Sequence, residues 1–409
     1  MKKLAITVKK SEFSFRHNLW ILALAFFFAV NMNNDWRTDY IIWYGALVFV
    51  FGAYLAAFNG KIPLIDLSFF YWALFFAGFG ILSLTWSKSV SVGMDVLKTL
   101  VVILAVLYLI HCSTKLGLDI RKILKIYFFA TVVNAVYVLF TVDLEQLGQV
   151  QLGTELIEGW NGNGIGFMTA QGALFGFYLM GTTKIKLEKL FYLIGFLTLS
   201  VVTMYTGSRT AFIMLVMELI LYFCLCKPQK MVRNVIIAAG ILALAAYLVM
   251  NVESFYEVLG KRLEGLFALF TGEGKVDGSA DRRDIYIRNG KQWFLENPIF
   301  GYGLNNYKVL NQAATGRFTY AHNNFIEIAV NLGVVGLVVY YGAYVYLIWE
   351  LFKNVKKGRF YAFLLSGLIA SLVVQYGTVS YYDFYQNFLL MVCFFAVAQA
   401  KKERIASPI

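Results

Sequence analysis

Charged residues are scarce in this sequence, and their scarcity excludes most soluble folds. Asp, Glu, Lys and Arg make up only 15% of the 409 residues, whereas a typical soluble domain contains about 25%. Hydrophobic residues make up 59% of the chain and aromatic residues 17%. Aromatic side chains are enriched where helices cross the two surfaces of a bilayer. The composition therefore predicts an all-α integral membrane protein.

Cysteine is also rare, which argues against a disulfide scaffold. We expect all four cysteines to lie in helices or at their cytoplasmic ends, and none in the longest outer segment; they are Cys112, Cys224, Cys226 and Cys393. This distribution predicts no disulfide and no metal cluster.

A nucleotide-driven enzyme needs a phosphate-binding loop, and the sequence offers only a poor match to one. The run Gly162–Gly166 lacks the Lys-Ser/Thr ending and lies at the outer end of a predicted helix. Its glycines are typical of close helix packing. The alternative is a substrate-lining turn in which Asn161 and Asn163 bind sugar hydroxyls. Neither interpretation requires a cofactor.

Apolar stretches long enough to cross a bilayer recur along the whole chain. They predict about twelve transmembrane helices, at residues 15–33, 40–58, 67–86, 92–111, 122–142, 162–181, 187–205, 210–226, 233–251, 323–350, 360–379 and 384–400.

The basic residues between these stretches set the orientation. If the N-terminus is inside, the inner side holds 23 Lys and Arg residues, and the short outer loops hold only Arg37, Lys88 and Arg209. Basic residues concentrate on the cytoplasmic side of membrane proteins, so both termini are predicted to be cytoplasmic. The net charge of +12 then reflects contact with anionic membrane lipid and gives no reason to expect nucleic acid.

The orientation divides the chain into three parts. Residues 1–251 contain the first nine helices, residues 252–321 form a large extracytoplasmic loop, and residues 322–409 contain the last three helices and a cytoplasmic tail. Loops of this length usually have a function. Apolar residues at helical spacing predict a short amphipathic helix from Arg282 to Glu296, and the proline that follows Asn297 ends it.

Arg209 lies at the outer surface between two predicted helices, in the run Thr206–Ala211. One interpretation is an arginine that caps a helix end and reaches toward the membrane surface. The other is an anion site, because a guanidinium group stays charged and binds phosphate through two parallel hydrogen bonds.

His322 begins the tenth predicted helix and is the only histidine on the outer side. A neutral imidazole can take a proton from a hydroxyl near pH 7; the alternative is a helix cap or packing residue. Asn323 and the intramembrane carboxylate Glu327 are candidates to orient the ring. Gly333 and Gly336 are expected to allow a neighbouring helix to approach closely.

These outer-face motifs resemble those of the O-antigen ligase and O-antigen polymerase (Wzy-type) superfamily of bacterial membrane glycosyltransferases. Three segments carry the resemblance: Thr206–Ala211; Arg283 followed by Asn297–Gly303; and His322-Asn323 followed by Gly333 and Gly336. The family often has an aromatic residue four positions after the loop arginine, where this chain has Ile287, so Arg282 remains an alternative to Arg283.

The resemblance implies a metal-independent, inverting glycosyltransferase with a GT-C-like fold. Its donor is an oligosaccharide linked to undecaprenyl diphosphate at the outer face of the bacterial cytoplasmic membrane, and a flippase and a chain-length regulator are the implied protein partners. By this resemblance His322 is the catalytic base, and Arg209 with Arg283 or Arg282 binds the diphosphate. Weaker candidates for substrate binding are Asn163, Tyr320, Asn323 and Glu327.

Three functions remain open from the sequence. A polymerase joins lipid-linked repeat units to one another, and the run from Glu296 to Gly303 favours this activity for capsule or exopolysaccharide. A ligase transfers the lipid-linked glycan to lipid A core or another acceptor. A lipid-linked sugar transporter is disfavoured, because the sequence shows no inverted repeat and few central charges.

We predict that residue 356 is cytoplasmic and residue 275 external. In a variant without the four native cysteines, Lys275→Cys should react in whole cells with a membrane-impermeant thiol reagent, and Lys356→Cys should react only after lysis. The reverse pattern would overturn the orientation.

Overall fold

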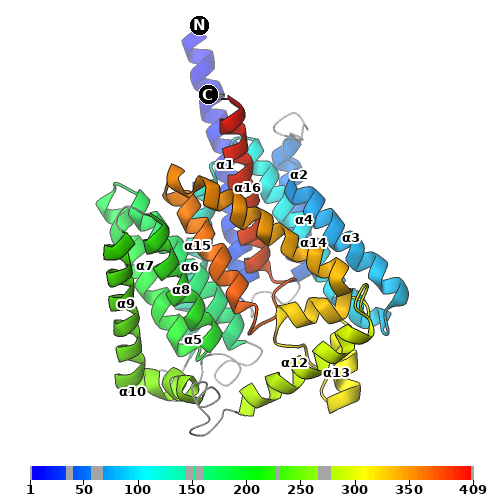
Figure 1. Ribbon diagram of the computed structural model, residues 1–409. Coiled ribbons are helices and arrows are strands. Elements are labelled where there is room, and N and C mark those ends of the chain that lie inside the picture. Colours follow the sequence, from blue (N-terminus) through cyan, green and yellow to red (C-terminus); the bar gives the residue numbers. More distant parts are fainter. Residues whose placement is uncertain are drawn as a thin grey trace.

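The computed structural model describes residues 2–33, 40–56, 68–142, 152, 161–226, 231–265 and 278–406, and these residues contain helices but no strand. The long helices pack side by side and place both chain ends at one end of the bundle (Figure 1). They are α1 (Lys2–Met32), α2 (Tyr40–Ala56), α3 (Ser68–Ser83), α4 (Val90–Lys115), α5 (Ile120–Thr141), α6 (Gly162–Thr182), α7 (Lys186–Tyr205), α8 (Arg209–Cys226), α9 (Met231–Asn251), α14 (Asn324–Asn354), α15 (Arg359–Val374) and α16 (Phe384–Ala406).

Each of the twelve predicted stretches coincides with one of these helices. Within the described residues, seven helices are long and apolar enough to cross a membrane by themselves, and three further apolar helices are shorter. The prediction of a multi-pass, all-α membrane protein is therefore confirmed, whereas the number of twelve spans stays a prediction. The outer loop 143–160, apart from Leu152, lies outside the described residues, as does 266–277 in the large loop.

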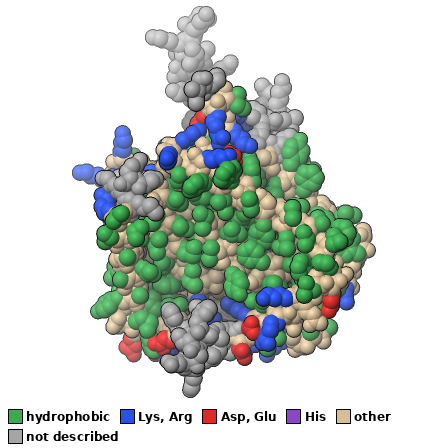
Figure 2. All heavy atoms as spheres, in the orientation of Figure 1, with side chains coloured by type: hydrophobic (Ala, Val, Ile, Leu, Met, Phe, Trp, Pro, Cys, Tyr) green, Lys and Arg blue, Asp and Glu red, His purple; other side chains and the backbone are tan. Residues whose placement is uncertain are grey.

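A broad belt of hydrophobic side chains covers the outside of the bundle, between two ends where charged side chains gather (Figure 2). Phe49, Phe75 and Phe140 are 80%, 66% and 85% exposed. Such exposure is unfavourable in water and is expected in contact with lipid. Inside the bundle, α6 packs against α5, α7, α8 and α15, while α14 packs against α3, α15 and α16.

Short elements lie across the end of the bundle opposite the chain ends (Figure 1). They are the short helices α10 (Glu253–Phe255), η3 (Tyr256–Gly260), α12 (Gly278–Glu296) and α13 (Tyr307–Thr315). The predicted end of the amphipathic helix at Glu296 is confirmed, although α12 begins four residues before Arg282. Its buried Tyr286 and half-buried Trp293 pack in a small second core with Tyr307.

The helix α14 is interrupted at Gly333, which has φ 63° and ψ −162°. A side chain at this position would collide with the carbonyl oxygen of Ile299. The close approach at Gly333 is therefore made by the loop after α12, and the expectation of a neighbouring helix is wrong here. Gly336 faces Leu332 of its own helix.

The interruption leaves backbone groups of α14 without helical partners, and the segment 298–303 satisfies them. Tyr302 N–H donates to the Val330 carbonyl at 2.9 Å and Gly303 N–H to the Asn331 carbonyl at 2.8 Å. In the other direction, Val334 N–H donates to the Pro298 carbonyl at 2.8 Å. Because unpaired backbone groups are costly away from water, these bonds fix the outer segment to the bundle.

We predict that Gly333→Ala lowers the thermal stability of the protein in detergent. An alanine costs about 1–3 kcal/mol in this backbone conformation, which is essentially restricted to glycine, and the collision with Ile299 adds to that cost. The matched control is Gly342→Ala in the same helix, where nothing lies within 4 Å of an added Cβ. This control should be neutral or stabilising by up to about 1 kcal/mol. Equal melting temperatures for the two variants would contradict the assigned role of the interruption.

Candidate active site

His322 lies between the outer segment and α14, and its backbone has φ 53°. This left-handed conformation is uncommon for residues other than glycine. The neighbouring residues hold it there: the Glu327 carboxylate accepts a hydrogen bond from Ala321 N–H at 2.7 Å, and Asn323 caps α14 by accepting one from Ile326 N–H at 3.0 Å. Glu327 and Asn323 are both fully buried.

These bonds revise two of the weaker candidates. The Glu327 carboxylate bonds the backbone before His322 and the Asn331 side chain (3.1 Å), so it supports the position of the histidine instead of bonding its ring. The Asn323 side chain is engaged by its own helix. Both residues therefore hold the backbone on either side of His322, and their binding of substrate stays a prediction.

The His322 ring faces a cavity of about 450 Å³ that is strongly basic. Its lining includes Arg282 and Arg283 from α12 and Arg317 from the segment after α13, and it contains no carboxylate among the described residues. The ring contacts two tyrosines: Tyr320 is tilted against it with centroids 4.2 Å apart, and Tyr286 is parallel to it with centroids 6.2 Å apart. An anion of two or more charges is the ligand that such a lining favours.

Burial lowers the pKa of His322 to about 4, and the positive charge of Arg283 acts in the same direction. The imidazole is therefore neutral at pH 7 and able to accept a proton. Burial raises the pKa of Tyr320, and the positive charge of Arg283 partly offsets this rise, so Arg283 lies close to both rings. Arg282 lines the same cavity but is exposed, which favours Arg283 as the arginine nearer the histidine.

Arg209 is placed apart from this cavity. It is buried at the start of α8, and its Nη1 donates to the Arg262 carbonyl at 3.1 Å. In return, Arg262 Nη1 donates to the Gly207 carbonyl at 2.8 Å. Each arginine thus donates to a backbone carbonyl at or near the position of the other arginine. Together the two bonds join the start of α8 to the segment after η3. The structure does not bring Arg209 and Arg283 into one described cavity.

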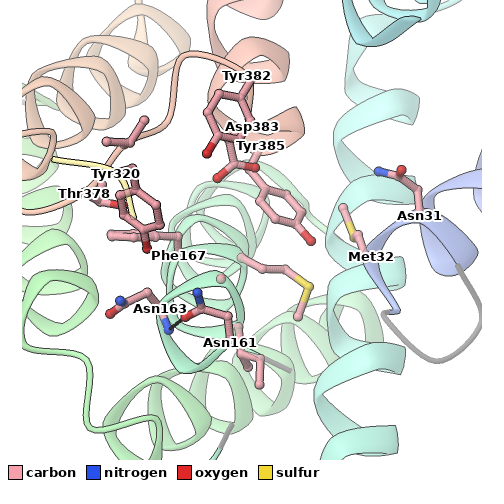
Figure 3. Close-up of a pocket in the computed structure, with 14 residues that line it drawn as sticks. Asn31, Met32, Asn161, Asn163, Phe167, Tyr320, Thr378, Tyr382, Asp383 and Tyr385 are labelled. Carbon is pink, nitrogen blue, oxygen red and sulfur yellow. Dashed lines mark hydrogen bonds between the residues drawn. The ribbon is translucent and has the colours of Figure 1, made fainter. Parts of the chain in front are cut away.

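A second cavity of about 400 Å³ lies next to Tyr320 (Figure 3). Asn161 and Asn163 reach it from the start of α6. Tyr382 and Asp383 reach it from the connection between α15 and α16, and Tyr385 from the start of α16. The close packing of the glycine run is confirmed, and the binding of sugar hydroxyls by its asparagines stays a prediction. Gly162 and Gly166 pack closely on the segment 206–211, whereas the asparagines between and before them line the cavity.

Sequence reasoning missed Asp383, Arg317, Arg262 and Tyr286. Asp383 is the only carboxylate in the run between the last two apolar stretches, which was a usable signal. Arg317 had no motif to identify it. No group of three His, Cys, Asp or Glu side chains that could hold a metal ion occurs in the described part of the chain.

Comparison with known proteins supports the family resemblance. Residues 194–341 match the family model described as O-antigen ligase. The chain is also 26% identical, over 314 residues, to the teichuronic acid biosynthesis protein TuaE of Bacillus subtilis (strain 168). The aligned region covers 69% of this chain and 61% of TuaE. The predicted resemblance to the O-antigen ligase and polymerase superfamily is confirmed.

We predict that His322 titrates well below the usual range and that Arg283 contributes to this. Modification of neutral His322 by diethyl pyrocarbonate, followed by peptide mass spectrometry between pH 4 and 8, should have a midpoint near pH 4. In Arg283→Gln the midpoint should move to higher pH, because removal of a nearby positive charge stabilises the imidazolium. A wild-type midpoint near 6.5, or no change in the variant, would contradict the arrangement.

Proposed function

We propose that this membrane protein is a polysaccharide polymerase that joins oligosaccharide repeat units carried on undecaprenyl diphosphate. One observation carries the proposal: a neutral histidine and three arginines meet in one cavity, at the end of the bundle opposite the basic chain ends. The similarity to a protein of teichuronic acid biosynthesis supports a role in an envelope polysaccharide.

The chemistry needs a base for the acceptor and positive charge for the leaving group. His322 takes the proton from an acceptor hydroxyl, whose oxygen forms a bond to the anomeric carbon of the donor sugar. The bond from that carbon to the diphosphate oxygen breaks, and undecaprenyl diphosphate leaves with the electron pair. Arg283, helped by Arg282 and Arg317, stabilises the charge that develops on the diphosphate. Attack from the opposite side inverts the anomeric configuration.

The low pKa of His322 fits a role that depends on the donor. A diphosphate bound by the arginines places negative charge near the ring and offsets the effect of Arg283. The imidazole then becomes a stronger base only when the donor is bound. Donor binding thus prepares the acceptor step.

Membrane location and partners follow from this activity. The donor lies in the outer leaflet of the cytoplasmic membrane, so both termini are cytoplasmic and the arginine cavity is external. A flippase that delivers the repeat unit and a regulator of chain length are the expected partners. The helical bundle and outer segment are compatible with a GT-C-like enzyme.

A ligase is the second candidate, because the matching family model is described as O-antigen ligase. The two activities share a donor and differ in the acceptor. Purified protein incubated with its lipid-linked repeat units should produce a ladder on a gel. Products only after addition of a separate acceptor would identify a ligase, and no product under either condition would contradict a transferase.

We predict that His322→Ala lowers the rate of glycosyl transfer by about 10²–10⁴-fold, the usual contribution of a general base. Arg283→Ala should lower kcat/KM by roughly 10–100-fold, because a charge-assisted contact contributes about 1.5–3 kcal/mol. Transfer rates should be compared at equal amounts of folded protein in detergent.

Arg282→Ala is the matched control for the arginine, because the two residues are adjacent on α12 and Arg282 is exposed. Arg282→Ala should lower kcat/KM clearly less than Arg283→Ala does. If Arg282→Ala is inactive and Arg283→Ala is active, the roles of the two arginines are exchanged. If His322→Ala keeps more than about a tenth of the wild-type transfer rate, His322 is not the general base.

A further inference from the structure

The two cavities on either side of Tyr320 have opposite charge. Three arginines and no carboxylate line the cavity of His322 within the described residues. The second cavity has one carboxylate, Asp383, and no Lys or Arg among the described residues that line it. A diphosphate is therefore favoured in the first cavity and repelled from the second.

The other residues that line the second cavity suit a neutral, hydroxyl-rich molecule. Amides, hydroxyls and aromatic rings surround Asp383, and they belong to Asn31, Asn161, Asn163, Thr378, Tyr382 and Tyr385. A carboxylate and amide groups accept or donate hydrogen bonds to hydroxyls, and aromatic rings cover apolar faces. The volume of about 400 Å³ falls within the range of about 300–1,000 Å³ typical of ligand sites.

We infer that the second cavity is the acceptor subsite, where Asp383 binds hydroxyls of the sugar that attacks the donor. This inference rests on the proposed transferase function. Tyr320 lines this cavity and contacts His322, which lines the other, so the base lies where an acceptor hydroxyl and a donor sugar would meet.

Hydrogen bonds to neighbouring segments hold the polar groups of the subsite. Ser208 Oγ donates to Asn163 Oδ1 at 2.6 Å, and Asn163 N–H donates to Asn161 Oδ1 at 2.9 Å, which orients both amides. The backbone of Asp383 is fixed as well: its N–H donates to the Ser380 carbonyl at 3.0 Å, and its carbonyl accepts from Asn387 Nδ2 at 2.8 Å. Figure 3 shows the Asp383 and asparagine side chains converging on the same space.

A further cavity of about 250 Å³ continues from this subsite. It shares Asn31, Tyr382, Asp383 and Tyr385 and extends toward Thr99 of α4. Asp383 therefore lines both cavities, at the place where they adjoin.

Two probes separate the subsites. Undecaprenyl diphosphate carries the diphosphate without sugar, and the free oligosaccharide carries the sugar without diphosphate. The oligosaccharide is released by mild acid from the lipid-linked glycan that accumulates in cells lacking this protein. Binding of each probe to purified full-length protein is measured in wild type, Asp383→Asn and Arg283→Gln.

We predict that Asp383→Asn weakens oligosaccharide binding by at least tenfold, as expected for loss of a charged hydrogen-bonding group, and changes undecaprenyl diphosphate binding by less than twofold. Arg283→Gln should show the opposite pattern. Retained lipid binding also demonstrates that Asp383→Asn is folded. Tyr382→Phe, which removes one hydroxyl from the lining, should weaken only the oligosaccharide, by a smaller factor.

Unchanged oligosaccharide binding in Asp383→Asn, or equal loss of both probes in a folded protein, would overturn the acceptor subsite. A wild-type protein that forms no transfer product and binds no undecaprenyl diphosphate would instead overturn the proposed function. In transfer assays, Asp383→Asn should raise the KM for acceptor much more than it lowers kcat. A lowered kcat at unchanged KM would contradict a binding role.

Discussion

The interruption of α14 at Gly333 is the constraint on which the site depends. A helix in a membrane normally satisfies all of its own backbone groups. Here several groups on both sides of the interruption bond the segment 298–303 instead. The residue after this segment is tied to the end of α3, where Leu304 N–H donates to Ser83 Oγ at 3.0 Å. The outer segment and the helix that follows His322 therefore form one unit.

Separation of charge is the second organising feature. The outer arginines gather on α12 and the segment after α13, whereas the single carboxylate of the second cavity comes from the connection before α16. The His322 ring is held between these regions by backbone bonds of its neighbours, and its own side chain remains available for chemistry. In the proposed reaction, the diphosphate of the donor and the sugar of the acceptor would thus enter different cavities before they meet at the base.

Long apolar stretches predicted the helices well, because burial in a membrane imposes them on the local sequence. The orientation derived from the basic loops stays a prediction. The end of α12 was also predictable, since proline acts locally. The role of Gly333 was not predictable from the sequence. Its positive φ accommodates a loop that lies about 30 positions earlier in the chain and approaches only in the fold. For the same reason Arg209 was grouped with Arg283 by motif alone, whereas the structure pairs it with Arg262. Asp383 was missed because its importance comes from three elements that meet only in the fold.

The packing of α12 along its length has a mechanical consequence. Tyr286 belongs to the small second core, Tyr307 Oη donates to the Tyr286 carbonyl at 2.7 Å, and Gly290 lies against Ile326 of α14. Arg282 and Arg283 lie one helical turn before Tyr286, so the same contacts fix the part of α12 that carries them. Positive charge that is fixed before a ligand arrives need not be reorganised when negative charge develops nearby.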